Sequence, residues 1–290
     1  MIEIVHLEPE TAGPYQPFTY RSYRDWLVRP DADPEGQKLA LGARWTGHPV
    51  GLLLAHSPAR DDPARVLSVF VDGRFRNRGI GTALMQELKA HLHRIKKRAC
   101  IEYYALNQYE ALERVLVKSG WQPPAVYSRF YRCDIFAGMP SPWIRRFKLP
   151  ARFRVVPWSE LRQNELALMN TLQEQDFNDY FMPLQKESII DRSCSLALKL
   201  DEQIVGWSIV DRELTDTLLY RALYIREAYR DQGLGLALAA QSAQRLGRTG
   251  ATHTVIQILD KNMRMRKVAE RLLAPMQPTV TAYKTALLEL

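Results

Sequence analysis

The 290-residue sequence contains only three cysteines, Cys100, Cys133 and Cys194, and no Cys-x-x-Cys pair. Such a sparse, odd-numbered set is typical of reduced thiols in the cytoplasm, and it argues against a disulfide framework or a zinc site. No apolar run approaches the ~20 residues that a membrane-spanning helix needs. The N-terminal segment lacks a basic stretch followed by an apolar one, so we expect no signal peptide. These absences predict a cytoplasmic protein without a metal centre.

Basic residues outnumber acidic ones, but they form no basic tail. The net charge is +8, with 19 Lys+Arg against 15 Asp+Glu in residues 1–140 and 21 against 17 in the remainder. The local run at residues 91–98 fits the solvated end of a helix, where cations complement the helix dipole. Alternatively, this basic run lies near the phosphate of a nucleotide-like ligand. The even distribution predicts no nucleic-acid partner.

The chain repeats itself. The segment Arg76–Leu84 (RNRGIGTAL) recurs as Arg230–Leu238 (RDQGLGLAL), an offset of 154 residues. Two further landmarks keep that offset to within one residue: Val50-Gly51 with Val205-Gly206, and Asn107 with Asn262. A constant offset indicates a duplication, and 290 residues suffice for two domains of ordinary size.

We expect the first domain to cover residues 1–137 and the second to cover residues 151–290. The linker between them, residues 138–150, has the glycine and prolines of turns and extended chain. Its stretch Trp143–Lys148 is amphipathic, so we expect it to lie across the surface of a domain.

Both halves show the same order of elements. In the first half, two apolar runs flank Thr46–Pro49 and predict a hairpin. The β-rich run Arg65–Val71 then leads into the glycine motif, and Thr82–Ile95 has helical spacing. The second half repeats this order around the strand Thr217–Ile225. The pattern predicts an α+β fold with a mixed sheet, and it differs from the strand–helix alternation of a Rossmann domain.

The glycine motif joins a strand directly to a helix. Such a loop exposes backbone N–H groups at the N-terminus of the helix, and these donors together with the helix dipole form a site for a phosphate or pyrophosphate. Gly79, Gly81, Gly233 and Gly235 have no Cβ that would hold the anion away from the backbone. The arginine that begins each motif adds charge-assisted hydrogen bonds.

The pattern Gln/Arg-x-x-Gly-x-Gly/Ala, placed between a strand and a helix, is similar to the acetyl-CoA signature of the GCN5-related N-acetyltransferase (GNAT) superfamily. The family's next landmarks are an Asn after the following strand and a helix that ends in Gly-aromatic. The first half has both, ending in Gly120-Trp121, whereas the second half has only the Asn. The resemblance implies two tandem GNAT domains, each with two central strands splayed around the cofactor.

By this resemblance, the pantetheine arm of acetyl-CoA would pair with the ends of the strands and the pyrophosphate would lie on the loops. The implied cofactor-binding residues are Val69, Val71, Arg76, Arg78, Gly79, Ile80, Gly81, Thr82, Asn107, Leu223, Ile225, Arg230, Gln232, Gly233, Leu234, Gly235, Leu236 and Asn262.

The sequence departs from the family at the catalytic groups. Many members have a Tyr four residues before the helix-ending Gly, where this chain has Leu116. Many also have a Glu on the strand before the loop, whereas the residue near that position in this chain is Ser68. Tyr103, Tyr104 and Tyr109 are therefore the candidate acids and Glu102 the candidate base. Alternatively, the tyrosines are packing residues, Glu102 faces solvent, and positioning alone accelerates transfer.

An acidic, aromatic segment, residues 173–183, lies where the family lines its acceptor side. Its carboxylates Glu174, Asp176 and Asp179 are candidates for binding a cationic amine, although the segment also fits an exposed helix end. The Gly-aromatic end and the tyrosines favour the first half as the catalytic one.

Together these features predict an acetyl-CoA-dependent N-acetyltransferase that acts on the primary amine of a small molecule. An acyl-CoA-binding regulatory protein without turnover and a protein N-acetyltransferase are the alternatives.

Overall fold

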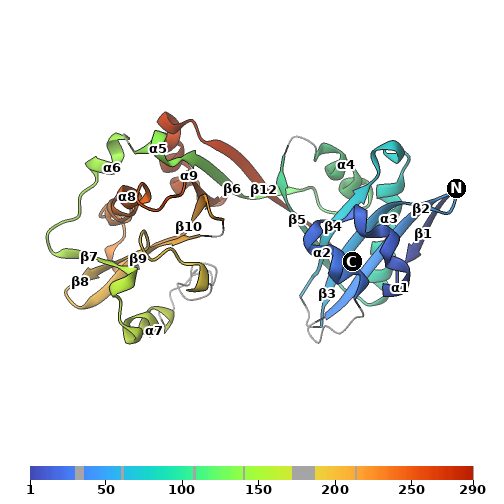
Figure 1. Cartoon of the computed structure of the whole chain (residues 1–290), viewed down its shortest axis with the longest axis horizontal. Coiled ribbons are helices and arrows are strands. Elements are labelled where there is room, and N and C mark those ends of the chain that lie inside the picture. The colour runs from blue at the N-terminus through green and yellow to red at the C-terminus, as the bar shows by residue number, and fades with distance from the viewer. Residues whose placement is uncertain are drawn as a thin grey trace. The chain divides into compact units, whose positions relative to one another are not determined.

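A computed structural model describes residues 1–29, 36–59, 62–106, 109–139, 141–171, 187–212 and 214–289. The chain forms two compact units. Unit 1 comprises Met1–Tyr127 and Ala282–Leu290, and unit 2 comprises Ser128–Thr281. Each unit combines a mixed sheet with helices, in agreement with the predicted α+β fold (Figure 1).

Unit 1 contains the strands and helices that the first half was expected to form. They are β1 (Ile2–His6), α1 (Pro9–Ala12), α2 (Arg21–Val28), β2 (Gly36–Trp45), β3 (His48–Pro58), β4 (Ala64–Val71), α3 (Ile80–Arg94), β5 (Ala99–Ala105) and α4 (Glu110–Lys118). Its strands lie in the order β1-β2-β3-β4-β5-β12, where β12 (Thr279–Leu288) is the last strand of the chain.

Unit 2 repeats this arrangement. Its elements are β6 (Ala125–Asp134), α5 (Ile135–Gly138), α6 (Pro142–Arg146), β7 (Phe153–Pro157), α7 (Gln163–Thr171), β8 (Leu196–Leu200), β9 (Gln203–Asp211), β10 (Thr217–Ile225), α8 (Leu234–Leu246), β11 (His253–Leu259) and α9 (Met263–Leu273). Its strands lie in the order β6-β11-β10-β9-β8-β7.

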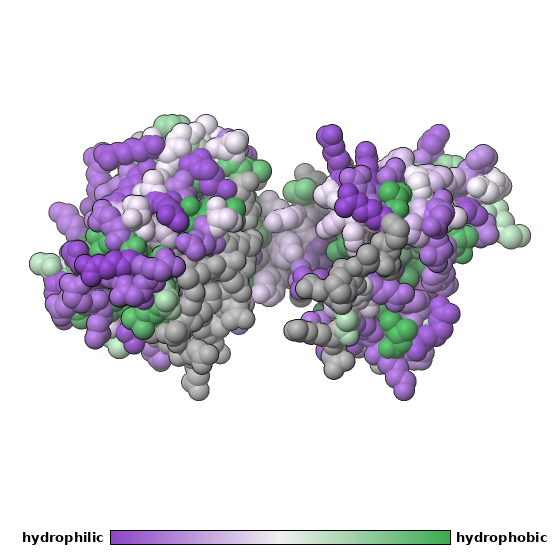
Figure 2. Space-filling view, turned by 60° about the horizontal axis from the view of Figure 1, so that its bottom comes forward, coloured by the Kyte–Doolittle hydropathy of each residue, from purple (hydrophilic) through white to green (hydrophobic). Residues whose placement is uncertain are grey.

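Local sequence explains most of these elements. The β2–β3 hairpin turns at Thr46 and Gly47, whose φ angles of 48° and 83° match the left-handed turn that suits twisted hairpins. Leu84, Leu88 and Leu92 form the apolar face of α3 and are fully buried against the sheet of unit 1. Hydrophobic residues on the visible surface occur in small groups among hydrophilic ones (Figure 2).

The two units differ from the expected boundaries because they exchange a strand. Residues Ser128–Asp134 of β6 pair antiparallel with Leu259–His253 of β11 in unit 2. Residues Ala282–Leu288 of β12 pair antiparallel with Ala105–Ala99 of β5 in unit 1. In Figure 1, the C-terminus accordingly lies in the unit that is otherwise blue to teal, and green β6 lies with the elements of unit 2. Each half of the sequence thus provides the last strand of the other half's sheet.

The expected linker, residues 138–150, is part of unit 2. Within it, α6 buries Ile144, which is 4% exposed and packs in one cluster with Val210, Leu218 and Leu246. Gln244 of α8 fixes the helix by donating a hydrogen bond of 2.8 Å to the Ile144 carbonyl oxygen. The amphipathic stretch therefore lies on a domain, as expected, but its apolar side belongs to the core.

The repeated Val-Gly pairs have a steric role. A Cβ added at Gly51 would lie 2.8 Å from the Phe70 carbonyl oxygen, and one added at Gly206 would lie 2.6 Å from the Tyr224 carbonyl oxygen. Each glycine lets its strand approach the end of the next strand, immediately before the glycine motif. This contact positions the motif in both units.

Candidate acyl-CoA cleft

The two glycine loops have the same backbone conformation. β4 ends at Val71 and β10 ends at Ile225, and a short 3-10 turn follows each of them. Gly79 and Gly233 are the N-caps of α3 and α8 in the left-handed region, with φ of 81° and 74°. Asn77 and Asp231 are also left-handed, with φ of 60° and 64°. The loop thus directs the N–H groups of the first helical turn, which have no intrahelical partner, away from the helix.

The arginine that begins each motif ties the loop to the strand before it. Arg76 Nε donates to the Val71 carbonyl oxygen at 3.1 Å, and Arg230 Nε donates to the Ile225 carbonyl oxygen at 3.0 Å. Each guanidinium also lies over the ring of the aromatic residue that comes just before this last strand residue. The distance from the guanidinium carbon to the ring centre is 5.6 Å in unit 1 and 6.0 Å in unit 2. These arginines therefore keep positive charge at the loop and fix its geometry.

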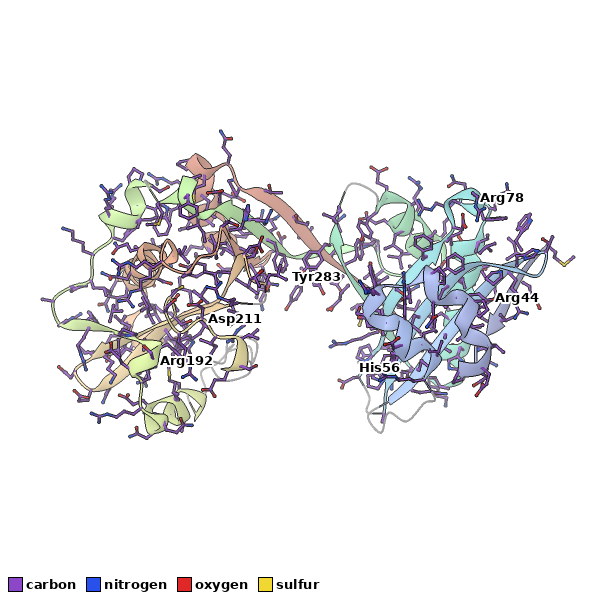
Figure 3. All side chains as sticks on the ribbon, in the orientation of Figure 1. Arg44, His56, Arg78, Arg192, Asp211 and Tyr283 are labelled. Atoms are coloured by element: carbon purple, nitrogen blue, oxygen red, sulfur yellow. The ribbon has the colours of Figure 1, made fainter. Side chains whose placement is uncertain are left out.

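The residue before the left-handed glycine differs between the units. In unit 1, the Arg78 guanidinium lies 5.1 Å from the centre of the Trp45 ring and 5.7 Å from that of Phe75 (Figure 3). In unit 2, Gln232 accepts a hydrogen bond from Arg152 at 3.1 Å. Cation–π contacts with two rings hold the Arg78 side chain in place, and the hydrogen bond from Arg152 does the same for Gln232, so each loop has its own local support.

In each unit the two central strands pair only at one end. The parallel pairing of β4 with β5 runs from Ala64↔Ala99 to Val66↔Ile101, and that of β10 with β11 runs from Thr217↔His253 to Tyr220↔Ile256. Beyond these pairs the strands diverge toward the glycine loops. Val69 and Val71 in unit 1, like Leu223 and Ile225 in unit 2, lie on the diverging part. They pair with β3 or β9 on one side, and on the other side an extended ligand can take the place of the missing central strand.

In unit 2 the diverging strands lead into a cavity of about 710 Å³. At one end it is lined by Arg230, Lys261 and Asn262, next to the glycine loop. Asn262 is also the N-cap of α9, where its Oδ1 accepts from the Met265 N–H at 3.0 Å. Apolar side chains of α8, α9, β10 and β11 line most of the remainder. A charged mouth and an apolar interior fit a ligand with a phosphate end and an uncharged arm.

In unit 1 the corresponding helices share a core. Leu116 of α4 and the following Trp121 are buried in the same cluster as Leu84 and Leu88 of α3. Val115 Cγ2 would lie 3.5 Å from a Cβ added at Gly81. In unit 2, the buried residues of α8 and α9 belong to separate clusters on the two sides of the cavity. α9 ends at Leu273 and is followed by the 3-10 turn Ala274–Met276, which has no aromatic residue equivalent to Trp121. Unit 2 therefore lacks the buried indole that packs with α3 and α4 in the core of unit 1.

The candidate acid–base residues lie on β5 and at the start of α4. Tyr109 is the N-cap of α4, and its ring stacks on Tyr103 with the centroids 5.1 Å apart. Tyr104 is 48% exposed, and its ring lies 5.0 Å from that of Tyr283. Tyr283 donates a hydrogen bond of 3.0 Å to Glu102 Oε2 (Figure 3). The structure therefore brings Glu102 and Tyr104 together with a tyrosine from the far end of the chain.

Burial and the nearby Glu102 carboxylate raise the pKa of Tyr283 well above its usual value, so the phenol stays protonated at neutral pH. Burial also raises the pKa of Tyr109. Sequence reasoning missed Tyr283 because it is 181 residues from Glu102 and enters unit 1 only through the exchanged strand.

Sequence reasoning also missed a buried ion pair in the wall of the cavity. Arg221 is the bulge residue of β10, where the register shifts between Tyr220 and Ala222. Its Nε lies 2.5 Å from Asp211 Oδ2, and the two side chains are 1% and 0% exposed. Arg221 also lines the cavity. The sequence offered one sign of this ion pair, a single arginine inside the apolar run Leu218–Leu223. A charged side chain that is buried in such a run requires a partner of opposite charge.

Four of the predicted site residues lie outside the described residues. They are Asn107 and the carboxylates Glu174, Asp176 and Asp179. Among the residues that the structure describes, no group of three or more His, Cys, Asp or Glu side chains is arranged to hold a metal ion. No helix in the described ranges is long and apolar enough to cross a membrane.

Comparison with known families gives a match in each half. The family model described as Acetyltransferase (GNAT) family matches residues 2–113 and 158–274. A search of the curated proteins finds no match.

Solved structures share the fold at low sequence identity. A tandem GNAT protein from the clavulanic acid biosynthesis pathway, solved without AcCoA, is 16% identical with a TM-score of 0.63, covering 99% of this chain and 98% of that one. A GCN5-related N-acetyltransferase from Sphaerobacter thermophilus is 17% identical with a TM-score of 0.59, covering 99% and 95%. A fungal glucosamine N-acetyltransferase region within a GH3 β-N-acetylglucosaminidase is 12% identical with a TM-score of 0.63, covering 99% of this chain and 38% of that protein.

Proposed function

Because the chain belongs to the Acetyltransferase (GNAT) family, with two copies of the domain, we propose that it is an acyl-CoA-dependent N-acyltransferase whose donor binds in unit 2. The cavity between α8 and α9 carries this proposal. It joins the glycine loop, the diverging strands and an apolar interior in one unit. In unit 1, Leu116 of α4 and Trp121 are instead buried in one core cluster with residues of α3. The proposal therefore places the donor in the half that the sequence did not favour.

The residues of unit 2 fit the parts of a CoA thioester. The N–H groups at the start of α8, together with Arg230 and Lys261, would hold the pyrophosphate. On the side of β10 that β11 does not pair, the backbone of Leu223 and the N–H of Ile225 would pair with the amides of the pantetheine arm. The cofactor would then reach the apolar interior beside the bulge at Arg221.

The proposed reaction forms an amide. The neutral nitrogen of a primary amine attacks the thioester carbonyl carbon, a C–N bond forms and the C–S bond breaks. The nitrogen loses one proton and the departing sulfur gains one, which yields the amide and free CoA-SH. A preorganised cleft that aligns nitrogen and carbonyl can supply several kcal/mol of the acceleration.

The acceptor in this proposal is a small-molecule amine. The acceptor would meet the thioester where the central strands of unit 2 diverge. Cys100, Cys133 and Cys194 are free thiols, which suits the cytoplasm as the site of the reaction.

Isothermal titration calorimetry with CoA and acetyl-CoA tests this proposal in a matched pair of variants, Gly235→Trp and Gly81→Trp. A side chain at position 235 would start 3.7 Å from Ile225 and 3.8 Å from Leu223, on the path of the pantetheine arm. We expect Gly235→Trp to weaken binding by about tenfold or more, and Gly81→Trp to leave it unchanged.

If the wild-type chain has no affinity for CoA or acetyl-CoA, the proposed function is wrong. If only Gly81→Trp weakens binding, the donor binds in unit 1 instead. Release of CoA-SH in the presence of a panel of primary amines, followed with a thiol reagent, then distinguishes a transferase from a protein that only binds acyl-CoA.

A further inference from the structure

The cavity of unit 2 extends well beyond the glycine loop. Leu236, Ala239, Ala243 and Leu246 of α8 all line it. These residues are three or four positions apart and form one face of the helix. At a rise of 1.5 Å per residue, the face from Leu236 to Leu246 is about 15 Å long. The cavity therefore follows nearly the whole length of α8.

The far part of the cavity lies past the point where the central strands separate. Ala243 and Leu246 pack in one cluster with Leu218, which pairs with Thr254 in the closed part of the β10–β11 ladder. The paired strands block passage through the sheet there. A group that enters this part of the cavity must therefore stay on the side of the sheet that α8 and α9 cover.

The walls of this far end are apolar and come from a segment that precedes the rest of unit 2 in sequence. Ile135 and Met139, at α5, and Trp143 and Ile144 of α6 line the cavity and belong to the same cluster as Ala243. An acetyl group has a single methyl group and would leave this end without a ligand. Well-formed apolar pockets of 300–1,000 Å³ normally enclose much larger apolar groups.

We propose that the donor of unit 2 is a CoA thioester with a medium-length saturated acyl chain, whose tail lies between α8 and α5–α6. The inference rests on the proposed function and specifies its acyl group. The bulge at Arg221 lies where the strands separate, so a thioester held there would direct its tail toward Ala243. The transfer step is unchanged: the amine nitrogen gains the acyl carbon, and the sulfur leaves with one proton.

The test measures the affinity of the full chain for CoA, acetyl-CoA, butyryl-CoA, octanoyl-CoA and palmitoyl-CoA by calorimetry, below the micelle-forming concentration of each thioester. Each methylene that becomes buried can tighten binding by up to about fourfold, although ordering of the chain offsets part of this gain. We expect octanoyl-CoA to bind about tenfold or more tightly than acetyl-CoA.

Two α8 variants one helical turn apart locate the tail. Ala243→Phe fills the far end and is expected to reduce the affinity for octanoyl-CoA to that for acetyl-CoA. Ala239→Phe lies nearer the glycine loop and is expected to weaken binding of every thioester. Gln241→Phe is the control, because Gln241 is on α8 but does not line the cavity. It should keep the wild-type preference.

Circular dichroism melting curves establish that each variant is folded. Should Ala243→Phe fail to fold, the chain-length series in the wild type decides alone. Equal affinity for acetyl-CoA and octanoyl-CoA would overturn the inference and leave the proposed function standing. An unchanged octanoyl preference in a folded Ala243→Phe variant would also overturn it. Absence of binding by every thioester and by CoA would refute the proposed function itself.

Discussion

At the scale of single residues, the arginine of the glycine motif has two roles that one substitution can separate. In both units its Nε bonds the last carbonyl of a strand, which fixes the loop, while its charge stays near the helix N-terminus. Arg230 lines the cavity of unit 2. We expect Arg230→Ala to weaken CoA binding by about tenfold, since a hydrogen bond from a charged group contributes about 1.5–3 kcal/mol. Arg76→Ala is the matched control.

Calorimetry on the two variants measures this difference. Arg230→Lys retains the charge but not the Nε geometry, so it should restore only part of the affinity. Equal weakening by Arg76→Ala and Arg230→Ala would mean that both loops bind the donor.

Two buried thiols are expected to make the folded chain less stable at alkaline pH. Burial raises the pKa of Cys133 to about 11 and that of Cys194 to about 12, from the usual 9.0. The folded state therefore favours the neutral thiols. Their contribution is complete below about pH 9 and is lost as the pH rises through the folded-state pKa values. We expect the melting temperature to fall between about pH 9 and pH 11.

The contribution of one thiol is measured by the variant Cys133→Ala, followed by circular dichroism across the same pH range. Its melting temperature should fall less steeply than that of the wild type, because one group that binds a proton more tightly in the folded state has been removed. Parallel curves for variant and wild type would contradict the assigned burial of this thiol.

At the scale of elements, two of the glycines of unit 2, Gly206 and Gly235, should respond differently to alanine. A Cβ at Gly206 would lie 2.6 Å from the Tyr224 carbonyl oxygen, so β9 and β10 would have to separate. We expect Gly206→Ala to lower the free energy of unfolding by about 1–3 kcal/mol. At Gly235 the nearest atom would be 3.7 Å away, within a helix. Gly235→Ala should be neutral or stabilising by up to about 1 kcal/mol. Urea denaturation compares the two variants.

The elements that local sequence determines were predicted well. The motif was expected to join a strand directly to a helix, and in the structure Gly79 and Gly233 are the N-caps of α3 and α8. The open cleft could not be predicted in the same way. It depends on whether a side chain such as Trp121 fills the space between two helices, which is a property of packing. The Gly-Trp end was interpreted as a sign of an active half, whereas in the structure it accompanies the packed half.

At the scale of the whole molecule, the exchange of β6 and β12 could not be deduced from local patterns. Both strands have the composition of sheet strands, and nothing in their own residues specifies the neighbouring strand. The pairing partner is determined by tertiary contacts such as Leu288, which is fully buried in the core of unit 1. Domain boundaries drawn at residues 137 and 151 therefore assign both strands to the half of the sequence that contains them, not to the sheet that they complete.

The exchange predicts that neither half of the sequence folds alone. A fragment of residues 1–137 would lack β12, so β5 would become an exposed edge and Ala286 and Leu288 would be missing from the core of unit 1. A fragment of residues 151–290 would lack β6, whose Tyr131 and Cys133 pack against Ala269 and Leu273 of α9. We expect both fragments to be largely unfolded or aggregated.

A chain that ends at Thr281 gives the sharper measurement, because it removes one exchanged strand and leaves unit 2 complete. Hydrogen exchange with mass spectrometry should show loss of protection in β5, whose residues Ala99–Ala105 pair with the deleted strand. β11, whose pairing with β6 and β10 is retained, should keep its protection. Because the proposed donor cavity lies in unit 2, the truncated chain should still bind CoA. Protection of β5 at the full-length level would show that β12 is not the strand that completes unit 1. Loss of protection in both strands would show that the two units fold as one cooperative structure.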